Sequence, residues 1–301
     1  MIDILIIGGG PAGLTAALYA ARAGKSVTFC ESESLGGQIT QSHQVDNYPG
    51  LPAVSGMALA DALTAQAMDA GAVLEFAQVD SVSREADGTF TAVTEDGTLQ
   101  AKAVIFAGGA KARPLGVDRE QDLVGRGVSY CALCDGAFFR GQDVAVVGGG
   151  STAFSDALYL AKICRSVKLI HRRDGFRAEL PLIEAAKATE NLEILTPYTV
   201  AALEGEDALQ ALVLTNAQTG DRKTVPVSAV FAAIGHMPNC APITGLAELD
   251  ASGYAVADEH CRTATPGLFV AGDCRTKEIR QLTTATADGT AAAVAACEYL
   301  G

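Results

Sequence analysis

The chain contains one short pattern twice: an apolar strand, a glycine-rich turn, a helix and a further strand. In the first copy the turn is Gly8-Gly9-Gly10-Pro11-Ala12-Gly13, between an apolar run at 3–7 and an Ala- and Leu-rich helical segment at 14–22. A second strand is expected at 26–30, and Glu31 follows it, 23 residues after the first glycine. This order and spacing are typical of a dinucleotide-binding α/β fold.

Each glycine of such a turn has a physical reason. The first permits the tight bend, the second lets the backbone approach a pyrophosphate, and the third lets the helix pack closely on the strand. An acidic residue after the second strand can accept hydrogen bonds from the ribose 2′-hydroxyl. The first copy therefore predicts a dinucleotide site that contains Gly8, Gly10, Gly13 and Glu31.

The second copy begins 140 residues later, at Gly148-Gly149-Gly150-Ser151-Thr152-Ala153. Strands are expected at 143–147 and 166–170, with a helix at 154–164 between them. The same reasoning makes Gly148, Gly150 and Ser151 candidates for a second dinucleotide site.

The residues after the second strand differ in charge between the two copies. His171 stands where the first copy has Glu31, and it is followed by Arg172, Arg173 and Arg177. A carboxylate would repel a nucleotide 2′-phosphate, whereas a set of guanidinium groups can pair with one. The second site is therefore predicted to prefer NADP(H) over NAD(H).

Two further segments show that the second copy lies inside the first. Residues 103–109 resemble residues 229–235, with an offset of 126. The first copy is therefore longer, and we place its extra residues at about 34–56, a stretch able to wrap a larger cofactor. Because the second copy interrupts the first, the chain crosses twice between domains, and the crossings at 110–114 and 235–239 are expected to hinge.

Two features near the C-terminus add to the first site. Residues 268–273 are predicted to be a strand that ends in Gly-Asp, where Asp273 can hydrogen-bond sugar or ribityl hydroxyls. The final helix is expected at about 281–299, and its positive N-terminus could point at a flavin ring. Taken alone, the same residues also fit a buried strand and an amphipathic closing helix.

A cysteine pair precedes the second glycine-rich strand, in Tyr130-Cys131-Ala132-Leu133-Cys134-Asp135-Gly136. In a cytosolic α/β chain, C-x-x-C more often marks a dithiol–disulfide switch than two inert thiols. A free thiol with a pKa of about 8.5 is only a few per cent thiolate at pH 7, so thiol exchange needs a proton acceptor and donor nearby. Cys131 and Cys134 are the candidate redox pair, and Asp135 is the candidate acid–base residue.

A metal site is not expected. Zinc requires four N or S ligands, and neither a second C-x-x-C nor a spaced histidine pair exists among His43, His171, His236 and His260. The other six cysteines are single and widely spread, and we interpret them as packing residues; they are at positions 30, 164, 240, 261, 274 and 297.

Composition excludes several partners. Acidic residues outnumber basic ones by 35 to 22, and a net charge of −13 repels both nucleic acid and anionic lipid. No apolar stretch reaches the roughly 18–20 residues that cross a bilayer. The chain also starts directly with an apolar strand rather than a basic leader, so a cytoplasmic protein is expected.

Motifs along the whole chain point to one family. They are Gly-Gly-Gly-Pro-Ala-Gly at 8–13, Gly36-Gly37-Gln38, Asn47-Tyr48-Pro49-Gly50, Cys-Ala-Leu-Cys-Asp-Gly at 131–136, His-Arg-Arg at 171–173, Gly-His-Met-Pro-Asn at 235–239, Ala-Gly-Asp at 271–273 and Arg280-Gln281. In this order they resemble the low-molecular-weight thioredoxin reductases of bacterial type. Leu133 departs from the Thr commonly found between the two cysteines.

The resemblance implies a three-layer α/β fold of two Rossmann-like domains, with the NADPH domain inserted into the FAD domain. The implied boundaries are 1–110 and 239–301 for FAD and 111–238 for NADPH and the C-x-x-C motif. It also implies a homodimer that reduces thioredoxin or a thioredoxin-like protein. A hydride would pass from NADPH to FAD, and electrons would then pass to the Cys131–Cys134 disulfide.

Residue roles follow from the same resemblance. Cys134 would face the flavin, Cys131 would attack the partner disulfide, and Asp135 would move the proton. Further residues are implied along the FAD; they are Gly37, Gln38, Asn47 and Gln281.

Four alternatives can be weighed against the residues. Another small dithiol carrier could replace thioredoxin, or the enzyme could run as an oxygen-dependent dithiol oxidase, although an oxidase needs no basic NADPH motif. A nucleotide-sensing protein without turnover would need no cysteine pair, and relatives of ferredoxin-NADP reductase lack one.

Overall fold

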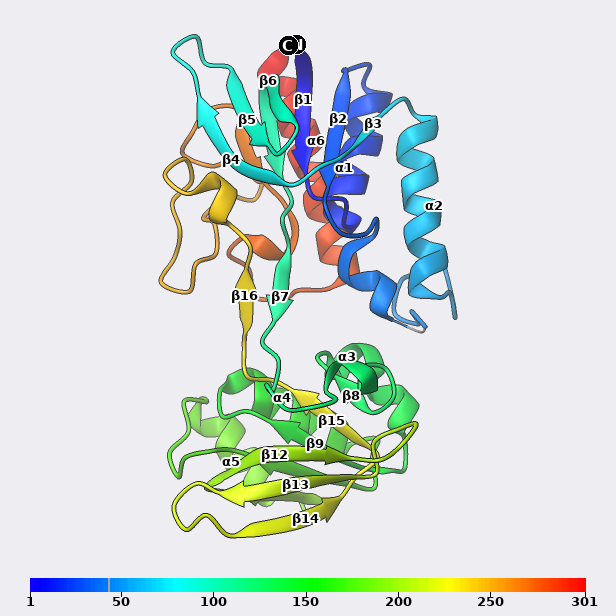
Figure 1. The fold of residues 1–301 in the computed structure, drawn as a ribbon, viewed down its shortest axis with the longest axis vertical. Helices are drawn as coiled ribbons and strands as arrows, with labels where there is room; N and C mark the ends of the chain where they lie inside the picture. The colour runs from blue at the N-terminus through cyan, green and yellow to red at the C-terminus, as the bar shows by residue number, and fades with distance from the viewer. Residues whose placement is uncertain (43) are drawn as a thin grey trace. The chain divides into compact units, whose positions relative to one another are not determined.

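Both copies of the repeated pattern fold as strand, turn, helix and strand (Figure 1). The computed structural model describes residues 1–42 and 44–301 and the side chains of all of these except Gln41. It divides into two compact units: unit 1 comprises Met1–Lys111 and Met237–Gly301, and unit 2 comprises Ala112–His236. The first copy of the pattern belongs to unit 1 and the second to unit 2.

Unit 1 is built around a seven-stranded sheet with the order β3-β2-β1-β6-β5-β4, in which β17 also pairs with β6. The strands β1, β2, β3, β17 and the second half of β6 are parallel, whereas β4 and β5 form an antiparallel extension. Its elements are β1 Ile2–Ile7, α1 Pro11–Arg22, β2 Val27–Glu31, α2 Gly56–Asp69, β3 Val73–Phe76, β4 Val79–Arg84, β5 Phe90–Thr94, β6 Gly97–Phe106, β17 Leu268–Val270 and α6 Leu282–Leu300.

Unit 2 contains a parallel sheet with the order β11-β10-β9-β15-β8 and a three-stranded antiparallel sheet, β12-β13-β14. Its elements are β8 Val128–Ser129, α3 Ala132–Asp135, β9 Asp143–Val147, α4 Ser151–Ala161, β10 Ser166–Ile170, α5 Leu180–Ala188, β11 Leu192–Leu195, β12 Tyr198–Glu204, β13 Ala211–Asn216, β14 Arg222–Pro226 and β15 Ala229–Ala232.

Alternating side chains give each unit two cores and three layers. In β1, Ile4 and Ile6 pack with α1 and α6, while Leu5 packs on the opposite face with β4 and β5. In β9, Val144 and Val146 pack with α4, while Ala145 lies against the antiparallel sheet. A parallel strand buried on both faces is largely apolar, and β1 and β9 are apolar apart from Asp3 and Asp143 near their starts. The α/β fold with two Rossmann-like units is thus confirmed.

The two crossings between the units pair with each other. The strand β7, Ala110–Ala112, lies beside β16, His236–Pro238, in a two-stranded sheet (Figure 1). Backbone hydrogen bonds from Arg113 N to Gly235 O (2.9 Å) and from Asn239 N to Gly109 O (3.1 Å) flank it. The chain therefore leaves unit 1 and returns to it through one short paired ribbon.

The predicted elements differ from the structure mainly at their ends. Strands 143–147 and 166–170 have the predicted bounds, but α1 begins at Pro11 and α4 at Ser151, inside the glycine turns. Pro11 suits the first helical turn because its missing N–H needs no partner there. The predicted strand 268–273 is too long: β17 ends at Val270, because Gly272 has φ +82° and starts a 3₁₀ turn at Gly272–Cys274.

Candidate active site

The glycines of the first turn have different neighbours. A Cβ on Gly8 would collide with Ala107 O, and one on Gly13 would collide with Gly8 O. Packing therefore accounts for both of these glycines. Gly10 has φ −77°, which any residue adopts, and a Cβ there would meet no described atom within 4 Å. The protein itself does not require glycine at position 10, as expected where a ligand approaches the backbone.

Glu31 ends β2 and bonds the turn itself. Its Oε2 accepts a hydrogen bond from Gly9 N at 2.8 Å, and its Oε1 accepts from Ser32 N at 2.8 Å and Glu33 N at 2.7 Å. These bonds fix the carboxylate beside the turn. Oε2, which accepts a single bond, keeps lone-pair capacity for a ligand hydroxyl.

Residues from the 34–56 segment lie against the same turn. Gly36 N donates to Gly9 O at 2.8 Å, and a Cβ on Gly37 would lie 3.4 Å from Gly10 Cα. The Gln38 side-chain amide donates to Ala110 O. The structure thus brings Gly37 next to Gly10, as a site shared by both segments requires.

Asn47 and Gln281 meet although 234 residues separate them in the sequence. Asn47 Nδ2 donates to Gln281 Oε1 at 3.2 Å. Gln281 is the N-cap of α6 in a capping box with Thr284, so its side chain is fixed at the start of that helix. The predicted helix at 281–299 is thus confirmed with its first residue as the cap.

Asp273 sits on a turn that a buried ion cluster holds. Gly272 N donates to Asp288 Oδ2 at 3.0 Å, and Arg275 binds the same carboxylate with two bonds of 2.9 Å. Lys277 Nζ lies 3.0 Å from Asp288 Oδ2 and 3.4 Å from Asp273 Oδ1. Burial opposes ionisation of Asp288, but Arg275 and Lys277 outweigh it and lower the pKa of Asp288.

Within this cluster one oxygen still lacks a hydrogen bond. Asp273 Oδ1 is buried and has no hydrogen-bond partner among the described residues, although Lys277 lies within ion-pair distance. A buried carboxylate oxygen without a hydrogen bond is costly unless a ligand supplies one. The hydroxyl groups of a flavin ribityl chain are donors of the required kind, so Gly10, Gly37 and Asp273 together fit FAD.

The second turn makes the same backbone hydrogen bond as the first. Gly148 N donates to Ile170 O at 3.0 Å, as Gly8 N donates to Cys30 O at 2.9 Å. A Cβ on Gly148 would collide with Ala233 O, whereas Gly150 has φ −101° and open space within 4 Å among the described residues. The second turn therefore also has one glycine that packing does not explain.

His171 takes the place of Glu31 but contacts the turn through its ring. A Cβ on Gly149 would fall on the imidazole, and the ring lies 5.6 Å from the ring of Phe176, centroid to centroid. Burial lowers the pKa of His171, and the neighbouring arginines lower it further. The ring is therefore neutral at pH 7, and the positive charge of this site comes from arginine.

The three arginines of the site are available to a ligand. Arg172, Arg173 and Arg177 are exposed, and their guanidinium groups make no hydrogen bond or ion pair with any described residue. Arg177 N donates to Gly149 O at 2.8 Å, which fixes this segment to the turn. Ser151 Oγ accepts from Glu179 N at 3.2 Å, so it also joins the turn to the arginine segment.

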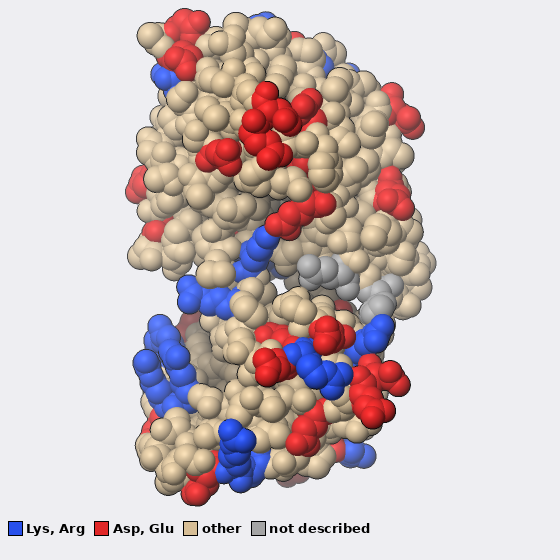
Figure 2. All heavy atoms as spheres, in the orientation of Figure 1, with Lys and Arg blue, Asp and Glu red and all other residues tan. Residues whose placement is uncertain are grey.

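The charge of the chain is divided unequally. Unit 1 carries 9 basic and 20 acidic residues, whereas unit 2 carries 13 and 15. Figure 2 shows Lys and Arg side chains gathered along one edge of unit 2, in the lower part of the view. The net charge of −13 therefore belongs mostly to unit 1, and unit 2 repels an anionic nucleotide far less.

The cysteine pair forms a disulfide in unit 2. Cys131 and Cys134 are bonded, with their Cα atoms 5.3 Å apart. Cys131 is the N-cap of α3, and its Sγ accepts a hydrogen bond from Cys134 N at 3.2 Å. Leu133 between them is 51% exposed, so the loop presents an apolar side chain to the surface.

Asp135 ends α3 and is held by a residue that the motifs did not single out. Ser129 Oγ donates to Asp135 Oδ2 at 2.6 Å and accepts from Cys131 N at 3.1 Å. A second overlooked residue is Glu120, which is 4% exposed and accepts from Leu115 N (2.7 Å), Gly116 N (2.8 Å) and Tyr130 Oη (2.8 Å). In the sequence, Ser129 and Glu120 are marked only by being polar residues that precede the cysteine pair.

Asp156 in α4 was also missed. Burial raises its pKa to about 6, and its side chain has no hydrogen bond to another described residue. A half-buried carboxyl one and a half turns into the helix after the second glycine turn could have been noticed, because the equivalent residue of α1 is Ala16.

The six single cysteines were predicted to be packing residues, and neither a metal site nor a membrane-spanning segment was expected. Five of the six remaining cysteines are buried, and Cys297 is partly exposed. Among residues 1–42 and 44–301, no group of three or more His, Cys, Asp or Glu could hold a metal, and no helix is long and apolar enough to cross a membrane. His43 lies outside the described residues.

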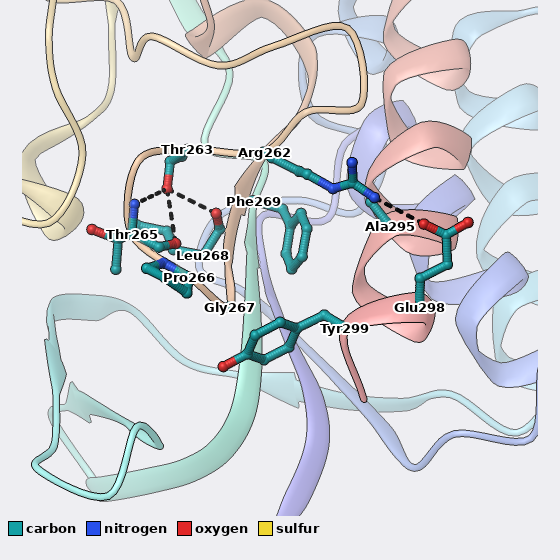
Figure 3. A pocket seen from close by; sticks show the side chains of 10 residues that line it. All are labelled: Arg262, Thr263, Thr265, Pro266, Gly267, Leu268, Phe269, Ala295, Glu298 and Tyr299. Atoms are coloured by element: carbon teal, nitrogen blue, oxygen red, sulfur yellow. Dashed lines mark hydrogen bonds and ion pairs between the residues drawn. The ribbon is translucent and has the colours of Figure 1, made fainter. Parts of the chain in front are cut away.

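A cavity of about 320 Å³ lies elsewhere, where the chain enters β17 beside the last turn of α6 (Figure 3). Its charged groups, Arg262 and Glu298, pair with each other at 2.8 Å. The Thr263 hydroxyl bonds within its own loop, accepting from Thr265 N at 3.1 Å. The cavity is at the amino end of β17, whereas Asp273 follows the carboxyl end, so it is not part of the candidate site.

Comparison with known proteins identifies the family. The model of the pyridine nucleotide-disulphide oxidoreductase family matches residues 2–289. The chain belongs to this family. A thioredoxin reductase of Mycolicibacterium smegmatis is 43% identical over 300 residues, which cover 99% of this chain and 96% of that protein. The crystal structure of thioredoxin reductase from Streptococcus pyogenes MGAS5005 has a TM-score of 0.95 at 40% identity and covers 100% of this chain and 98% of that one.

A bifunctional thioredoxin reductase/thioredoxin of Mycobacterium leprae (strain TN) is 42% identical over 300 residues. These residues cover 99% of this chain but 66% of that longer protein. The bacterial-type thioredoxin reductase resemblance is thus confirmed, and this family member is an NADPH-dependent flavoprotein disulfide reductase that uses FAD. The two alternative activities, a dithiol oxidase and a reductase of another small dithiol carrier, are not favoured.

Proposed function

We propose that this pyridine nucleotide-disulphide oxidoreductase reduces the disulfide of thioredoxin, or of a thioredoxin-like protein, through Cys131 and Cys134. The observation that carries the proposal is the Cys131–Cys134 disulfide beside Asp135, in the same unit as the unpaired arginines. The longer Mycobacterium leprae relative carries thioredoxin in its own name, which supports this partner.

Unit 1 would hold the FAD. Gly8, Gly10 and Gly13 would form the turn under the pyrophosphate, with Glu31 on the ribose. Four further residues and Asp273 would line the rest of the cofactor; the four are Gly37, Gln38, Asn47 and Gln281. The buried Asp273 oxygen without a hydrogen bond and the open space at Gly10 support this assignment. When bound, FAD supplies the two-electron chemistry that links a nicotinamide to a disulfide.

Unit 2 would hold the NADPH. Gly148, Gly150 and Ser151 would bind the pyrophosphate at the start of α4, where the helix N-terminus favours an anion. The adenosine 2′-phosphate would pair with Arg172, Arg173 and Arg177, and the neutral His171 would pack against the turn. The absence of any acidic partner for these guanidinium groups within the described residues supports the assignment.

The sulfur chemistry would proceed as thiol–disulfide exchange. The reduced Cys131 attacks one sulfur of the partner disulfide, and that bond breaks with its electron pair on the partner's other sulfur, which takes up a proton. Cys134 then attacks the mixed disulfide, restoring the Cys131–Cys134 bond and releasing the second partner thiol. Asp135 would accept the proton that Cys131 loses and pass it to the first partner sulfur that departs, and the proton that Cys134 loses would go to the second partner sulfur.

The test begins with the purified protein. A flavin absorption spectrum and thioredoxin-dependent oxidation of NADPH are expected. In Cys134→Ser, NADPH should still bleach the flavin, but thioredoxin reduction should fall below detection, since no internal disulfide can form.

Two results would overturn parts of this proposal. A colourless protein that FAD cannot reconstitute contradicts the cofactor assignment. Retained thioredoxin turnover in Cys134→Ser contradicts the electron path. The variant Cys297→Ser is the matched control, because Cys297 is a partly exposed single thiol in unit 1 and should leave turnover unchanged.

Assembly and location are further proposals. We infer a homodimer in the cytoplasm from the family resemblance. Light scattering of the purified protein tests the first, and a monomer at micromolar concentration would contradict it.

A further inference from the structure

Ser129 lies between the attacking cysteine and the acid–base residue. Its hydroxyl donates to Asp135 Oδ2 at 2.6 Å and accepts a bond from Cys131 N at 3.1 Å. The backbone oxygen of Cys131 is also near, at 3.4 Å, but a hydroxyl has one proton and the short bond to a carboxylate is the stronger. The proton of Ser129 therefore points at Asp135.

The sheet fixes the position of Ser129. It is the last residue of β8, where Ser129 pairs with Phe231 of β15 in parallel register, and it is 4% exposed. Asp135, by contrast, ends a helix of one turn whose backbone bond runs from Asp135 N to Cys131 O at 3.1 Å. A short helix alone holds a side chain loosely, whereas a buried hydroxyl on a strand is rigid.

We propose that Ser129 is a positioning residue for thiol–disulfide exchange: it holds the Asp135 carboxylate and the Cys131 backbone in one fixed arrangement. This inference rests on the proposed role of Asp135 as the proton carrier. Ser129 touches neither sulfur in the mechanism and gains or loses no proton itself. It acts by keeping the carboxylate of Asp135 at a set place relative to Cys131 while the loop changes between disulfide and dithiol.

A simple capping role predicts something different. Ser129 would then bond Cys131 N only to stabilise the turn, and its loss would lower stability without altering the proton step. A positioning role predicts that loss of the hydroxyl changes the rate and pH dependence of exchange as loss of Asp135 does. The two roles are therefore separable by experiment.

The experiment uses the FAD-loaded full chain, reduced with NADPH and mixed rapidly with excess oxidised thioredoxin between pH 5 and 9. Ser129→Ala is expected to slow thioredoxin reduction about tenfold and to make the rate less dependent on pH. Asp135→Asn is expected to change the pH dependence of the rate in the same way. The double variant should be no slower than Asp135→Asn alone. Ser129→Thr, which keeps the hydroxyl, should stay within about twofold of the parent.

A second readout needs no turnover. Mass spectrometry of the chemically reduced protein measures the rate at which iodoacetamide alkylates Cys131 at each pH. Ser129→Ala and Asp135→Asn should both shift the pH at which this rate rises, and in the same direction. Ser155→Ala, an exposed serine of α4, is the matched control and should leave both profiles unchanged.

The outcomes separate the inference from its premise. If Asp135→Asn changes neither profile, the proposed proton carrier is wrong. If Asp135→Asn changes them and Ser129→Ala does not, only the positioning role is wrong. Effects of the two variants that multiply in the double variant would also overturn it, because Ser129 cannot slow the proton step by misplacing a carboxylate that Asp135→Asn has already removed.

Discussion

The two glycine turns make the same backbone hydrogen bond to the end of the next strand and differ in the side chain that follows that strand. Both turns place a glycine against the carbonyl of the residue that follows a neighbouring strand, Ala107 after β6 and Ala233 after β15, and both leave a second glycine facing open space. In unit 1 Glu31 bonds the turn through its carboxylate, whereas in unit 2 the ring of His171 fills the same position. The two turns thus share a backbone hydrogen bond and an open glycine but differ in the charge that the next strand places beside them.

The surroundings of the turns differ as well. In unit 1 the turn at Gly272 and Asp273 is held by Asp288, Arg275 and Lys277, whose side chains are at most 12% exposed. In unit 2 the segment that carries the arginines is exposed and is tied to its turn mainly by backbone bonds. Buried ion pairs therefore hold the residues around Asp273, whereas the residues around the arginines are exposed.

The largest expected effect comes from the two glycines that packing does not explain. Gly10→Ala should fold but bind FAD about 1,000-fold more weakly, because overpacking against a ligand and lost N–H contacts together cost about 4 kcal/mol. Gly150→Ala should keep its flavin and lose NADPH binding by a similar factor. Flavin absorbance and NADPH titration measure the two.

Comparing Gly10→Ala with Gly150→Ala shows whether each glycine acts on its own nucleotide. If Gly10→Ala lowered thermal stability of the FAD-free protein, the glycine would be structural after all. Loss of NADPH binding in Gly10→Ala with flavin retained would contradict the assignment of nucleotides to units.

The arginines provide the second largest effect. Arg172→Ala with Arg173→Ala should weaken NADPH binding about 100-fold, at roughly tenfold for each 1.4 kcal/mol of lost phosphate contact. NADH binding should change less than threefold, since NADH has no 2′-phosphate. Titration with NADPH and with NADH measures the two dissociation constants. Equal losses of affinity would show that the arginines do not bind the 2′-phosphate. The control Arg222→Ala removes an exposed charge of β14 elsewhere in unit 2.

The smallest expected effect is on stability, at a position where the two repeats differ. Asp156 in α4 is equivalent to Ala16 in α1. Burial raises the pKa of Asp156 to about 6, so the folded state holds its proton more tightly than the unfolded chain, whose carboxyl has the ordinary value of 3.8. Stability is therefore lost as pH rises from about 4 to about 6. Asp156→Asn should stabilise unit 2 by about 2 kcal/mol above pH 7, which is less than the full shift implies because solvent reaches the side chain.

Hydrogen exchange of α4 peptides at pH 4 and pH 7.5 tests this. The gain in protection should appear at pH 7.5 and vanish at pH 4. A gain of equal size at both pH values would mean that packing, not ionisation, distinguishes the variant. The exposed Glu184 of α5 gives the control variant Glu184→Gln, which should behave as the parent.

Local pattern was enough for the strands and helices of both repeats. The strands 143–147 and 166–170 were predicted to the residue, because strands of a covered parallel sheet are mostly apolar and these two flank the glycine turn and its helix. The ends of α1 and α4 were less accurate, since helix propensity does not show that the glycine turn already has helical backbone. The over-long strand at 268–273 failed for a related reason: one positive φ at Gly272 ends it.

Contacts across large sequence distances could not be predicted from the residues. The motifs named Asn47, Gln281 and Asp273, but not the bond between the first two or the cluster around Asp288 that holds the third. The hinge at the two crossings stays a prediction. The role of Ser129 had no motif at all.

By itself, the sequence determined the repeat, the change from an acidic residue at Glu31 to a basic segment at His171, and the cysteine pair, since spacing and residue chemistry are local properties. Only the tertiary structure decided which glycines face open space, which carboxylate oxygen lacks a hydrogen bond, and that Ser129 holds Asp135. These facts depend on where separate strands and turns bring atoms together, and a one-dimensional pattern does not contain those distances.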